Sequence, residues 1–379
     1  MEWKEVDICQ LCDSVSETYK GNASEVVLIN TSDVLDGKCL NHEYVPNKKL
    51  KGQFKKTFRK GDILYSEIRP ANKRFCFVDF EPKDYIASTK LMVLRAHEDV
   101  DPQYLYQILR SNDTLAQLQM LAESRSGTFP QITYSELSNI MVSLPSQKAQ
   151  KNIVSILSSL DRKIELNNKI NADLEEMAQA IFKNWFVDFE PFKDGKFVDS
   201  ELGMIPEGWK VGCLGDIAEI TSGKRPPKKS KDKTKELFIP LIGASDIMGF
   251  TSDVLYERPI LVIGRVGTHG VVQRFQEKCW PSDNTLVIES SYYNYVYQLL
   301  KGIDYSAINR GSTQPLITQT DVKNTDVIIA PENVLKEYES ITSTLFSKHR
   351  ANIKENSRLS LLRDTLLHRL MSGELEVPE

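Results

Sequence analysis

Hydrophobic residues recur at helical spacing along two long stretches of the chain, neither of which contains a proline or a glycine. In the first stretch, after Pro145, the spacing alternates between four and three residues, and the positions are Ile153, Leu157, Leu160, Ile164, Asn167, Asn171, Leu174, Ala178 and Ile181. This heptad spacing is typical of a coiled-coil seam. About forty residues of helix, at about 1.5 Å each, predict a rod of about 60 Å.

The second stretch follows Pro331 and has a rougher seam, formed by Ile341, Leu345, Ile353, Leu359, Leu362, Leu366 and Leu370. Gly373 stands where a helix is expected to end. A single helix of this length cannot bury its own seam, so we expect the two helices to pair antiparallel within one chain. Pairing with another subunit would leave the same pattern. Four asparagines near the seam either set its register or are simply solvated: Asn167, Asn168, Asn171 and Asn356.

The rest of the chain has short runs of Val, Ile and aromatic residues between Gly, Pro and Asn, such as VVLIN, RFCFVDF, KLMVLRA, PILVIG and NTLVIES. Such runs predict β-strands. We expect one helix of moderate length around residues 101–122 and another around 291–301. The pattern indicates mixed α/β domains with antiparallel or mixed sheets.

These globular parts repeat one another. LINTSDV (28–34) matches LIGASDI (241–247), and YLYQILRS (104–111) matches YVYQLLKG (295–302). The other matches are EWKEV (2–6) with GWKVG (208–212), DILYSEIRP (62–70) with PILVIGRVG (259–267), ASTKLMVL (87–94) with PSDNTLVI (281–288), and SGTFPQITYSELSNIMVSLP (126–145) with GSTQPLITQTDVKNTDVIIAP (311–331). Matches that keep the same order along the chain indicate a duplicated domain with its helix.

We therefore predict an α+β chain with two similar mixed α/β domains, at residues 1–145 and 191–330. Two long antiparallel helices, at residues 146–190 and 331–379, separate these domains and form an intramolecular coiled coil. The duplication predicts pseudo-twofold symmetry.

Composition changes this picture little. The chain is 41% hydrophobic and 26% charged, and it has no apolar run of about 18 residues that could span a bilayer. Its first ten residues do not form a secretory signal, so we expect a cytoplasmic protein. Cys9 and Cys12 have C-x-x-C spacing without a second pair, which favours reduced structural thiols over a metal site.

The distribution of charge points to a polyanionic partner. The net charge is −4, but residues 47–61 carry seven basic residues and no acid, and residues 223–236 carry seven against two acids. Clusters of this kind contact nucleic-acid phosphates or form ordinary solvated loops.

Motifs of catalysis are missing from the sequence. It has no phosphate-binding G-x-x-x-x-G-K-[ST] loop, no G-x-G-x-x-G after a strand, and no Asn/Asp-Pro-Pro-aromatic stretch. His269, in GTHG, has no neighbouring acid and is more often inert in such a loop. We predict no catalytic residue, no cofactor and no metal, which favours a binding protein over an enzyme.

The chain resembles the specificity (S) subunit of type I restriction–modification systems. The most specific match is the join FKNWFVDFEPFKDGKFVDSELGMIPEGWKVGCLGDI (182–217). The repeated Ser-Asp and G-x-x-x-P-x-I-T elements and the segment LLRDTLLHRLMSGEL (361–375) are similar as well. The resemblance covers essentially the full length.

This resemblance implies a DNA-binding subunit without catalysis of its own. Each globular domain would be a target-recognition domain that reads one half of a split double-stranded DNA sequence. The helices would fix the distance between half-sites and dock two modification subunits, which methylate adenine. Motor–nuclease restriction subunits would join for cleavage. The target bases cannot be read from the chain.

Candidate DNA contacts lie on loops. Those expected at phosphates are Lys48, Lys49, Lys51, Lys55, Lys56, Lys224, Arg225, Lys228, Lys229 and Lys231. Those expected at base edges are Arg69, Asn72, Lys73, Arg74, Arg125, Ser126 and Thr128 in the first half, and Arg265, Thr268, His269, Arg310, Ser312, Thr313 and Gln314 in the second. Their placement rests on two loop matches, IRPANKR with GRVGTHG and RSGT with RGST. Arg125 and Arg310 are the most attractive pair, although an arginine before Gly-Ser also caps turns.

Aromatic residues suggest packing more than DNA contact. The tyrosines of YLYQIL and YVYQLL have helical spacing and are expected in the core rather than stacked on bases. A second group either packs the first long helix against the second domain or docks a modification subunit: Trp185, Phe186, Phe189 and Phe192.

Two other hypotheses remain at this point. The chain could be a stand-alone DNA-acting enzyme with a cryptic nuclease or methyltransferase site. It could also be a coiled-coil adaptor that never contacts DNA, against which the two lysine clusters argue.

Overall fold

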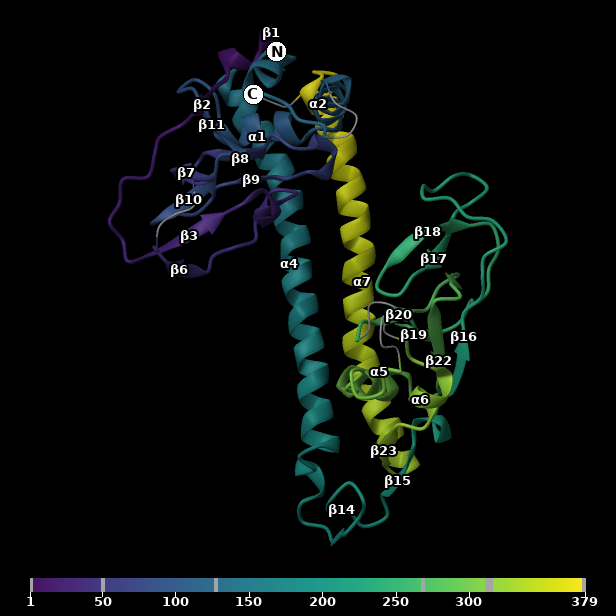
Figure 1. Ribbon diagram of the computed structural model, residues 1–379. Helices are drawn as coiled ribbons and strands as arrows, with labels where there is room; N and C mark the ends of the chain where they lie inside the picture. The colour runs from purple at the N-terminus through teal and green to yellow at the C-terminus, as the bar shows by residue number, and fades with distance from the viewer. Residues whose placement is uncertain (1–2, 49–51, 126–128, 267–269, 311–315, 377–379) are drawn as a thin grey trace. The chain divides into compact units, whose positions relative to one another are not determined.

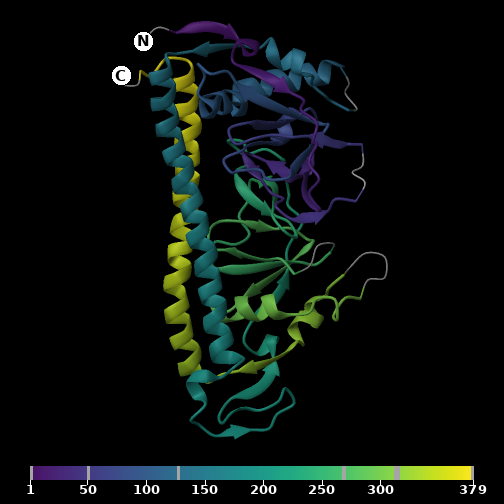
Figure 2. The same cartoon turned by 90° about the vertical axis from the view of Figure 1, so that its left-hand side faces the viewer.

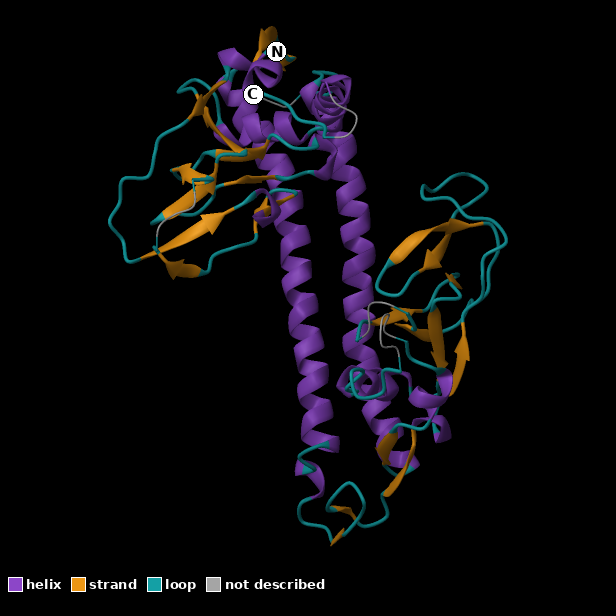
Figure 3. Ribbon diagram, viewed as in Figure 1, coloured by secondary structure: helices purple, strands orange, loops and turns teal. Residues whose placement is uncertain are grey.

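The computed structural model describes residues 3–48, 52–125, 129–266, 270–310 and 316–376 (Figure 1). The chain divides into two compact units. Unit 1 consists of Met1–Asn167 and Lys354–Glu379, and unit 2 of Asn168–Ile353. Both units combine helices and sheets, as Figure 3 shows by colour, which confirms the predicted mixed α/β class.

Unit 1 contains two four-stranded sheets. Its strands are β1 (Lys4–Asp7), β2 (Cys12–Val15), β3 (Glu25–Ile29), β4 (Val34–Leu35), β5 (Lys38–Cys39), β6 (Tyr44–Pro46), β7 (Phe54–Lys56), β8 (Ile63–Ser66), β9 (Phe75–Phe77), β10 (Tyr85–Ser88), β11 (Leu91–Ala96) and β12 (Met141–Leu144). One sheet has the antiparallel order β2-β11-β8-β9, and the other has the order β6-β3-β10-β7 with β3 and β10 parallel. A separate antiparallel pair joins β1 to β12.

Unit 2 repeats most of this topology, although its second sheet has three strands, in the order β18-β17-β21. Its strands are β13 (Phe197–Val198), β14 (Ile205–Pro206), β15 (Lys210–Cys213), β16 (Glu219–Ser222), β17 (Ile239–Ile242), β18 (Ile247–Thr251), β19 (Ile260–Gly264), β20 (Val272–Phe275), β21 (Trp280–Pro281), β22 (Thr285–Glu289) and β23 (Asp326–Ile329). The order β16-β22-β19-β20 reproduces β2-β11-β8-β9, the parallel pair β17–β21 reproduces β3–β10, and β15–β23 reproduces β1–β12. The structure thus confirms the duplication.

The short helices follow from local capping signals. They are α1 (Pro102–Arg110), α2 (Asn112–Arg125) and α3 (Tyr134–Ser138) in unit 1, and α5 (Tyr293–Gly302) and α6 (Gln319–Lys323) in unit 2, with 3₁₀ turns η1 (Ile8–Gln10), η2 (Thr31–Asp33), η3 (Pro70–Asn72), η4 (Glu190–Phe192) and η5 (Leu214–Asp216). The Asp101 carboxylate accepts hydrogen bonds from the backbone amides of Gln103 and Tyr104 and so caps the beginning of α1. The sequence predicts a single helix over 101–122, but the structure has two. Ser111 adopts an extended conformation that ends α1, and its hydroxyl accepts a hydrogen bond from the Thr114 amide, which caps the beginning of α2.

Two long helices, α4 (Gln147–Phe186) and α7 (Glu332–Met371), belong to both units. Figure 2 shows each as one uninterrupted helix. In unit 1 the first half of α4 runs antiparallel to the last half of α7, and Arg363 Nη1 donates a hydrogen bond to Asp161 Oδ1 at 2.8 Å. In unit 2 the remaining halves pair in the same sense, with the rings of Phe186 and Tyr338 5.0 Å apart. The predicted antiparallel pairing within one chain is confirmed. No helix in the described part of the chain carries an apolar stretch able to cross a membrane.

The predicted seam is right for α4 and partly wrong for α7. Every predicted position of α4 is buried or half-buried. On α7, however, Ile341, Ile353 and Leu362 are exposed. The neighbouring Thr342 is buried, and Asn352 and Arg363 contact α4, so a pattern search for apolar residues misses these inward positions.

Asparagines pair across the seam in both units. In unit 1 the Asn167 amide donates to Asn356 Oδ1 and to Glu355 Oε2, both at 2.9 Å. In unit 2 the Asn352 amide donates to Asn171 Oδ1 at 2.9 Å. Asn168 is exposed, whereas Asn352, which the sequence pattern missed, is buried. Three of the four predicted asparagines are therefore seam residues, and pairing of buried amides is a known means of fixing coiled-coil register.

The tyrosines of the repeated helices belong to the core, as expected. Tyr104 and Tyr295 are fully buried, and each hydroxyl donates to a carbonyl of the last strand before a long helix, at Ser143 and Ile328. The second aromatic group packs inside unit 2. The ring centroids of Phe186 and Tyr295 lie 4.7 Å apart, and those of Phe192 and Trp209 lie 5.1 Å apart. Of the two alternatives for this group, packing of the helix end against the second domain is the one observed.

The asparagine pair of unit 2 yields a prediction. Asn352→Leu should lower the free energy of unfolding by about 1–3 kcal/mol, because it leaves the buried Asn171 amide without its partner. The double variant Asn171→Leu/Asn352→Leu should recover most of that stability, since two leucines suit a seam. Denaturant unfolding measures both values.

Gln179→Leu, at an exposed position of α4, is the matched control and should change stability by no more than about 0.5 kcal/mol. Additive destabilisation in the double variant would show that the two asparagines are not coupled.

Candidate nucleic-acid interface

Three loops of unit 1 meet beyond the ends of β8 and β11. The Glu67 amide donates to the Lys90 carbonyl at 3.1 Å, and the Ile132 amide donates to the Glu67 carbonyl at 2.8 Å. The Arg69 amide donates to the Pro130 carbonyl at 3.1 Å, and Ile68 forms an isolated antiparallel β-bridge with Gln131. We call residues 67–69, 88–90 and 130–132 the loop junction of unit 1. Of the residues that the sequence predicts at DNA, the junction contains Arg69.

Unit 2 has the same junction, at residues 264–266, 282–284 and 316–317. The Arg265 amide donates to the Asn284 carbonyl at 2.9 Å, and the Ile317 amide donates to the Arg265 carbonyl at 3.0 Å. Val266 forms an isolated antiparallel β-bridge with Leu316. The backbone hydrogen bonds therefore recur pair by pair in the two units.

In unit 1, the first predicted basic segment adjoins the junction. β7 pairs with β10, and the Thr89 amide donates to the Gln53 carbonyl at 2.7 Å. Lys55 is exposed on β7, and Lys48 is exposed after β6, at the other edge of the same sheet. Lys56 is different, because its ammonium group donates to the Leu91 carbonyl at 2.8 Å and burial lowers its pKa. Lys56 therefore supports the sheet.

The second basic segment is attached beside the junction of unit 2 by different hydrogen bonds. The amides of Gly223 and Lys224 donate to Thr285 and Pro281, each at 3.0 Å. A Cβ at Gly223 would lie 2.1 Å from the Ser282 carbonyl oxygen, so only glycine fits there. The exposed residues beyond it are Lys224, Arg225, Lys228, Lys229 and Lys231. This segment lies between β16 and β17, whereas residues 47–53 lie between β6 and β7. The two units thus present positive charge from loops that are not equivalent.

Arg125 and Arg310 are equivalent, and each is ion-paired. Arg125 Nη1 lies 3.0 Å from Glu136 Oε2, and Arg310 Nε lies 2.8 Å from Asp321 Oδ1. Each acid also closes a capping box, with Thr133 in α3 and with Thr318 in α6. Arg125 and Arg310, which directly precede the segments SGTFPQIT and GSTQPLIT, are thus tied to the helix that follows each segment, and their guanidinium groups remain more than half exposed.

The other described candidates differ in position. Arg69 is exposed and has a left-handed backbone, with φ 45°, at the start of η3, and Asn72 is exposed in the same turn. Arg74 donates to the carbonyls of Ser32 and Val34, which makes it a support of the fold. Nε of Arg265 is buried and meets no hydrogen-bond partner among the residues that the structure describes. The remaining candidates lie outside the described residues: Lys49, Lys51, Ser126, Thr128, Thr268, His269, Ser312, Thr313 and Gln314.

Strand pairing corrects one loop match. The match of IRPANKR with GRVGTHG makes Arg69 the counterpart of Arg265, but the junction hydrogen bonds make Glu67 its counterpart. Because of this shift, the sequence reasoning missed Glu67, Lys90 and Gln131 at the junction of unit 1, and Asn284 and Leu316 in unit 2. Aligning the copies through β8 and β19, which pair with β11 and β22, would have found them.

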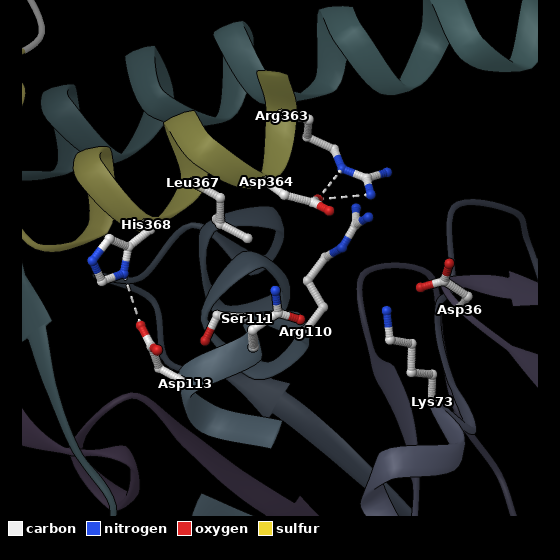
Figure 4. A pocket seen from close by; sticks show the side chains of 10 residues that line it. Asp36, Lys73, Arg110, Ser111, Asp113, Arg363, Asp364, Leu367 and His368 are labelled. Atoms are coloured by element: carbon white, nitrogen blue, oxygen red, sulfur yellow. Dashed lines mark hydrogen bonds and ion pairs between the residues drawn. The ribbon is translucent and has the colours of Figure 1, made fainter. Parts of the chain in front are cut away.

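A pocket of about 170 Å³ in unit 1 is lined by Lys73, another candidate (Figure 4). Lys73, Arg110 and Arg363 share it with Asp36, Asp113 and Asp364. Arg110 and Arg363 both bind Asp161, at 2.9 and 2.8 Å, and His368 contacts Asp113 at 3.0 Å. With its charges balanced and mostly paired, the pocket joins α1 and α2 to α7 and has no excess of donors for phosphate.

The cysteines give no sign of a metal centre. Cys9 is exposed and Cys12 is buried, and both are free thiols. Burial raises the pKa of the Cys12 thiol to about 12, which keeps it protonated. Within the described ranges, no cluster of His, Cys, Asp and Glu could hold a metal ion.

Comparison with known proteins identifies relatives over nearly the whole chain. The family model described as "Type I restriction modification DNA specificity domain" matches residues 2–176 and 206–359. The "Type I restriction enzyme HindI specificity subunit" of Haemophilus influenzae is 31% identical, and the match covers 99% of this chain and 100% of that protein. The "Type I restriction enzyme MjaIX specificity subunit" of Methanocaldococcus jannaschii is 30% identical, with 89% and 85% covered.

The fold has a solved counterpart as well. The crystal structure of a type I restriction–modification system S subunit from M. genitalium matches with a TM-score of 0.57, over 100% of this chain and 97% of that one. At 16% sequence identity this likeness concerns the fold alone.

The ion pair of Arg310 with Asp321 yields a prediction about pH. Hydrogen bonds from Thr318 and Arg310 outweigh the effect of burial and hold the pKa of Asp321 below its usual 3.8. A depressed pKa in the folded state stabilises the protein above that value, and this stabilisation disappears as pH falls below it. Asp321→Asn should therefore flatten the decline of unfolding free energy below about pH 4, measured by denaturant titration at several pH values. Asp326→Asn, at an exposed strand position, is the control and should keep the decline of the parent. Parallel curves for Asp321→Asn and the parent would contradict the assignment.

Proposed function

This chain belongs to the type I restriction modification DNA specificity family, and from that premise we propose that it is the sequence-reading subunit of a type I restriction–modification complex. Each unit reads one half of a split double-stranded DNA sequence. The observation that carries the proposal is the loop junction, which is built twice in one chain with the same backbone hydrogen bonds and with exposed basic residues beside it.

The residues beside the junctions suit the two parts of DNA recognition. Exposed lysines such as Lys55, Lys228 and Lys229 supply phosphate contacts, which give affinity without sequence preference. Side chains on the junction loops supply hydrogen-bond donors and acceptors for base edges. The net charge of −4 does not oppose this, because the basic residues are gathered on a few loops.

We assign four segments to these tasks. Residues 1–145 and 191–330 read the half-sites, and residues 146–190 and 331–379 set the number of base pairs between them. Support comes from α4 and α7, since each helix contributes one half to unit 1 and the other half to unit 2.

The chain performs no chemistry itself and works through partners. Its relatives are named as specificity subunits of restriction enzymes, and these names give no support to a stand-alone nuclease or methyltransferase. Two modification subunits, which methylate adenine, and motor–nuclease restriction subunits complete the complex in the cytoplasm, where the DNA lies. Exposed apolar residues on the long helices, among them Leu166 and Leu361, are suited to such docking.

The proposed function is tested directly by reconstitution. The purified chain alone should transfer no methyl group, and adding its modification subunit should produce methylated adenine within one split sequence, read by methylation-sensitive sequencing. Methyl transfer by the chain alone would contradict the proposal, as would methylation of an unsplit sequence.

Spacing gives a sharper prediction. A seven-residue insertion after Asn167 in α4, matched by another after Ile353 in α7, lengthens both helices by about 10 Å and returns the seam to nearly the same face. Because each base pair adds about 3.4 Å, the spacer should grow by about three base pairs while both half-sites stay unchanged. The same insertion in the loop at residues 199–203 is the control and should leave the spacer as it was. A constant spacer in both variants would refute the helices as its determinant.

Charge on the basic loop of unit 2 gives another prediction. Lys228→Gln/Lys229→Gln should weaken binding to all duplexes alike and reduce the slope of log K against log salt by about 0.9 for each phosphate that is no longer neutralised. Fluorescence anisotropy at several salt concentrations measures the slope. Lys148→Gln/Lys151→Gln, at the exposed beginning of α4, is the matched control with the same change in charge. Equal slopes for both double variants would show that this loop does not bind DNA.

A further inference from the structure

The two loop junctions share their backbone hydrogen bonds, but several of their side chains differ. Position by position, Glu67, Lys90 and Gln131 in unit 1 correspond to Arg265, Asn284 and Leu316 in unit 2. The correspondence is fixed by equivalent hydrogen bonds, from Glu67 to Lys90 and from Arg265 to Asn284, and by the bridges at Gln131 and Leu316.

Several residues around these positions are the same in both units, although Thr89 corresponds to Asp283. Buried serines occupy 88 and 282, isoleucines 132 and 317, capping threonines 133 and 318, and arginines 125 and 310. The three divergent pairs lie within this shared surrounding. A duplicated backbone frame that carries different side chains is the arrangement expected when the frame positions the side chains and the side chains select the partner.

All six side chains are accessible. Lys90 and Asn284 are exposed, and the other four are half-buried in both units, so exposure also matches pair by pair. In unit 1, Lys90 Nζ lies 3.4 Å from Glu67 Oε2 and 3.3 Å from Gln131 Oε1. These contacts are longer than the usual hydrogen bond of about 2.9 Å, so they are weak enough to be exchanged for contacts with a ligand.

The chemistry of the six residues is that of base recognition. Lysine and arginine donate to guanine, glutamine and asparagine pair with adenine, glutamate accepts from cytosine, and leucine contacts the thymine methyl group. Nε of Arg265 is buried and has no hydrogen-bond partner among the described residues. Two different sets of this kind are suited to two different half-sites.

We propose that Glu67, Lys90 and Gln131 in unit 1, and Arg265, Asn284 and Leu316 in unit 2, are specificity-determining residues that select bases of their respective half-sites. This inference rests on the proposed function and assigns part of the base selection to six residues.

The test copies the set of unit 2 into unit 1. The triple variant Glu67→Arg/Lys90→Asn/Gln131→Leu, within the full chain and assembled with its modification subunit, is compared with the parent by methylation-sensitive sequencing. Methylation at the original first half-site should fall about tenfold or more, the value of one bidentate pairing with a base. The preferred bases of the first half-site should change, while the second half-site and the spacer remain.

Two further variants make the outcome decisive. Glu136→Asp also copies a residue of unit 2 into unit 1, but at the frame, and should leave the methylated sequence unchanged. Lys90→Asn alone alters one exposed side chain and covers the case in which the triple variant does not fold. An unaltered first half-site in every variant that still methylates would overturn the inference. A parent that recognises no split sequence would instead overturn the proposed function.

Discussion

Pairing of α4 with α7 is the interaction on which the structure depends. The core of unit 1 takes Ile153 and Leu157 from α4 and Leu367 and Leu370 from α7. The core of unit 2 draws on both helices in the same way, with Phe186 from α4 and Tyr338 from α7. Unit 1 is therefore built from two separate pieces of sequence and remains incomplete until Lys354–Glu379 has been made, whereas unit 2 is the continuous segment Asn168–Ile353. The end of α7 is held there too, because Gly373, with φ 73°, packs against the Trp3 ring with no room for a Cβ.

The pairing is polar where a stronger seam would be apolar. Buried amides at Asn167, Asn171 and Asn352 contribute less stability than leucine would, and each becomes destabilising if unpaired. What they add is register, because an amide pair is satisfied at only one offset of the helices. If the distance between half-sites is to be fixed, the offset between α4 and α7 must be fixed first, so a less stable but better defined seam suits the proposed function.

Sequence patterns predicted two kinds of feature: the segments that repeat along the chain, and the elements whose buried residues are hydrophobic at regular spacing. The α4 seam, the duplicated strands and the buried Tyr104 and Tyr295 all carry such a signal. The α7 seam does not, since its inward positions include Thr342 and Arg363, and an apolar search passes over both. The loop junctions were found only in part. Matching loops by composition is insensitive to a shift of two residues, and such a shift separates Arg69 from Glu67, the true counterpart of Arg265. Strand pairing fixes that register, and it is a property of the folded chain.

If the proposed junction residues select bases, one frame carrying two sets of side chains lets a single polypeptide address two unlike sequences, provided that its own helices pair with each other. The most direct test of that pairing is an engineered cross-link. Cysteines at positions 171 and 352, where the native asparagine amides meet at 2.9 Å, should form a disulfide within one chain when dilute protein is mildly oxidised, giving a monomer with altered mobility on non-reducing electrophoresis. In a chain that also carries Cys9→Ser, which removes the exposed native thiol, covalent dimers in place of that monomer would show that each helix finds its partner in a second chain, and would contradict the account.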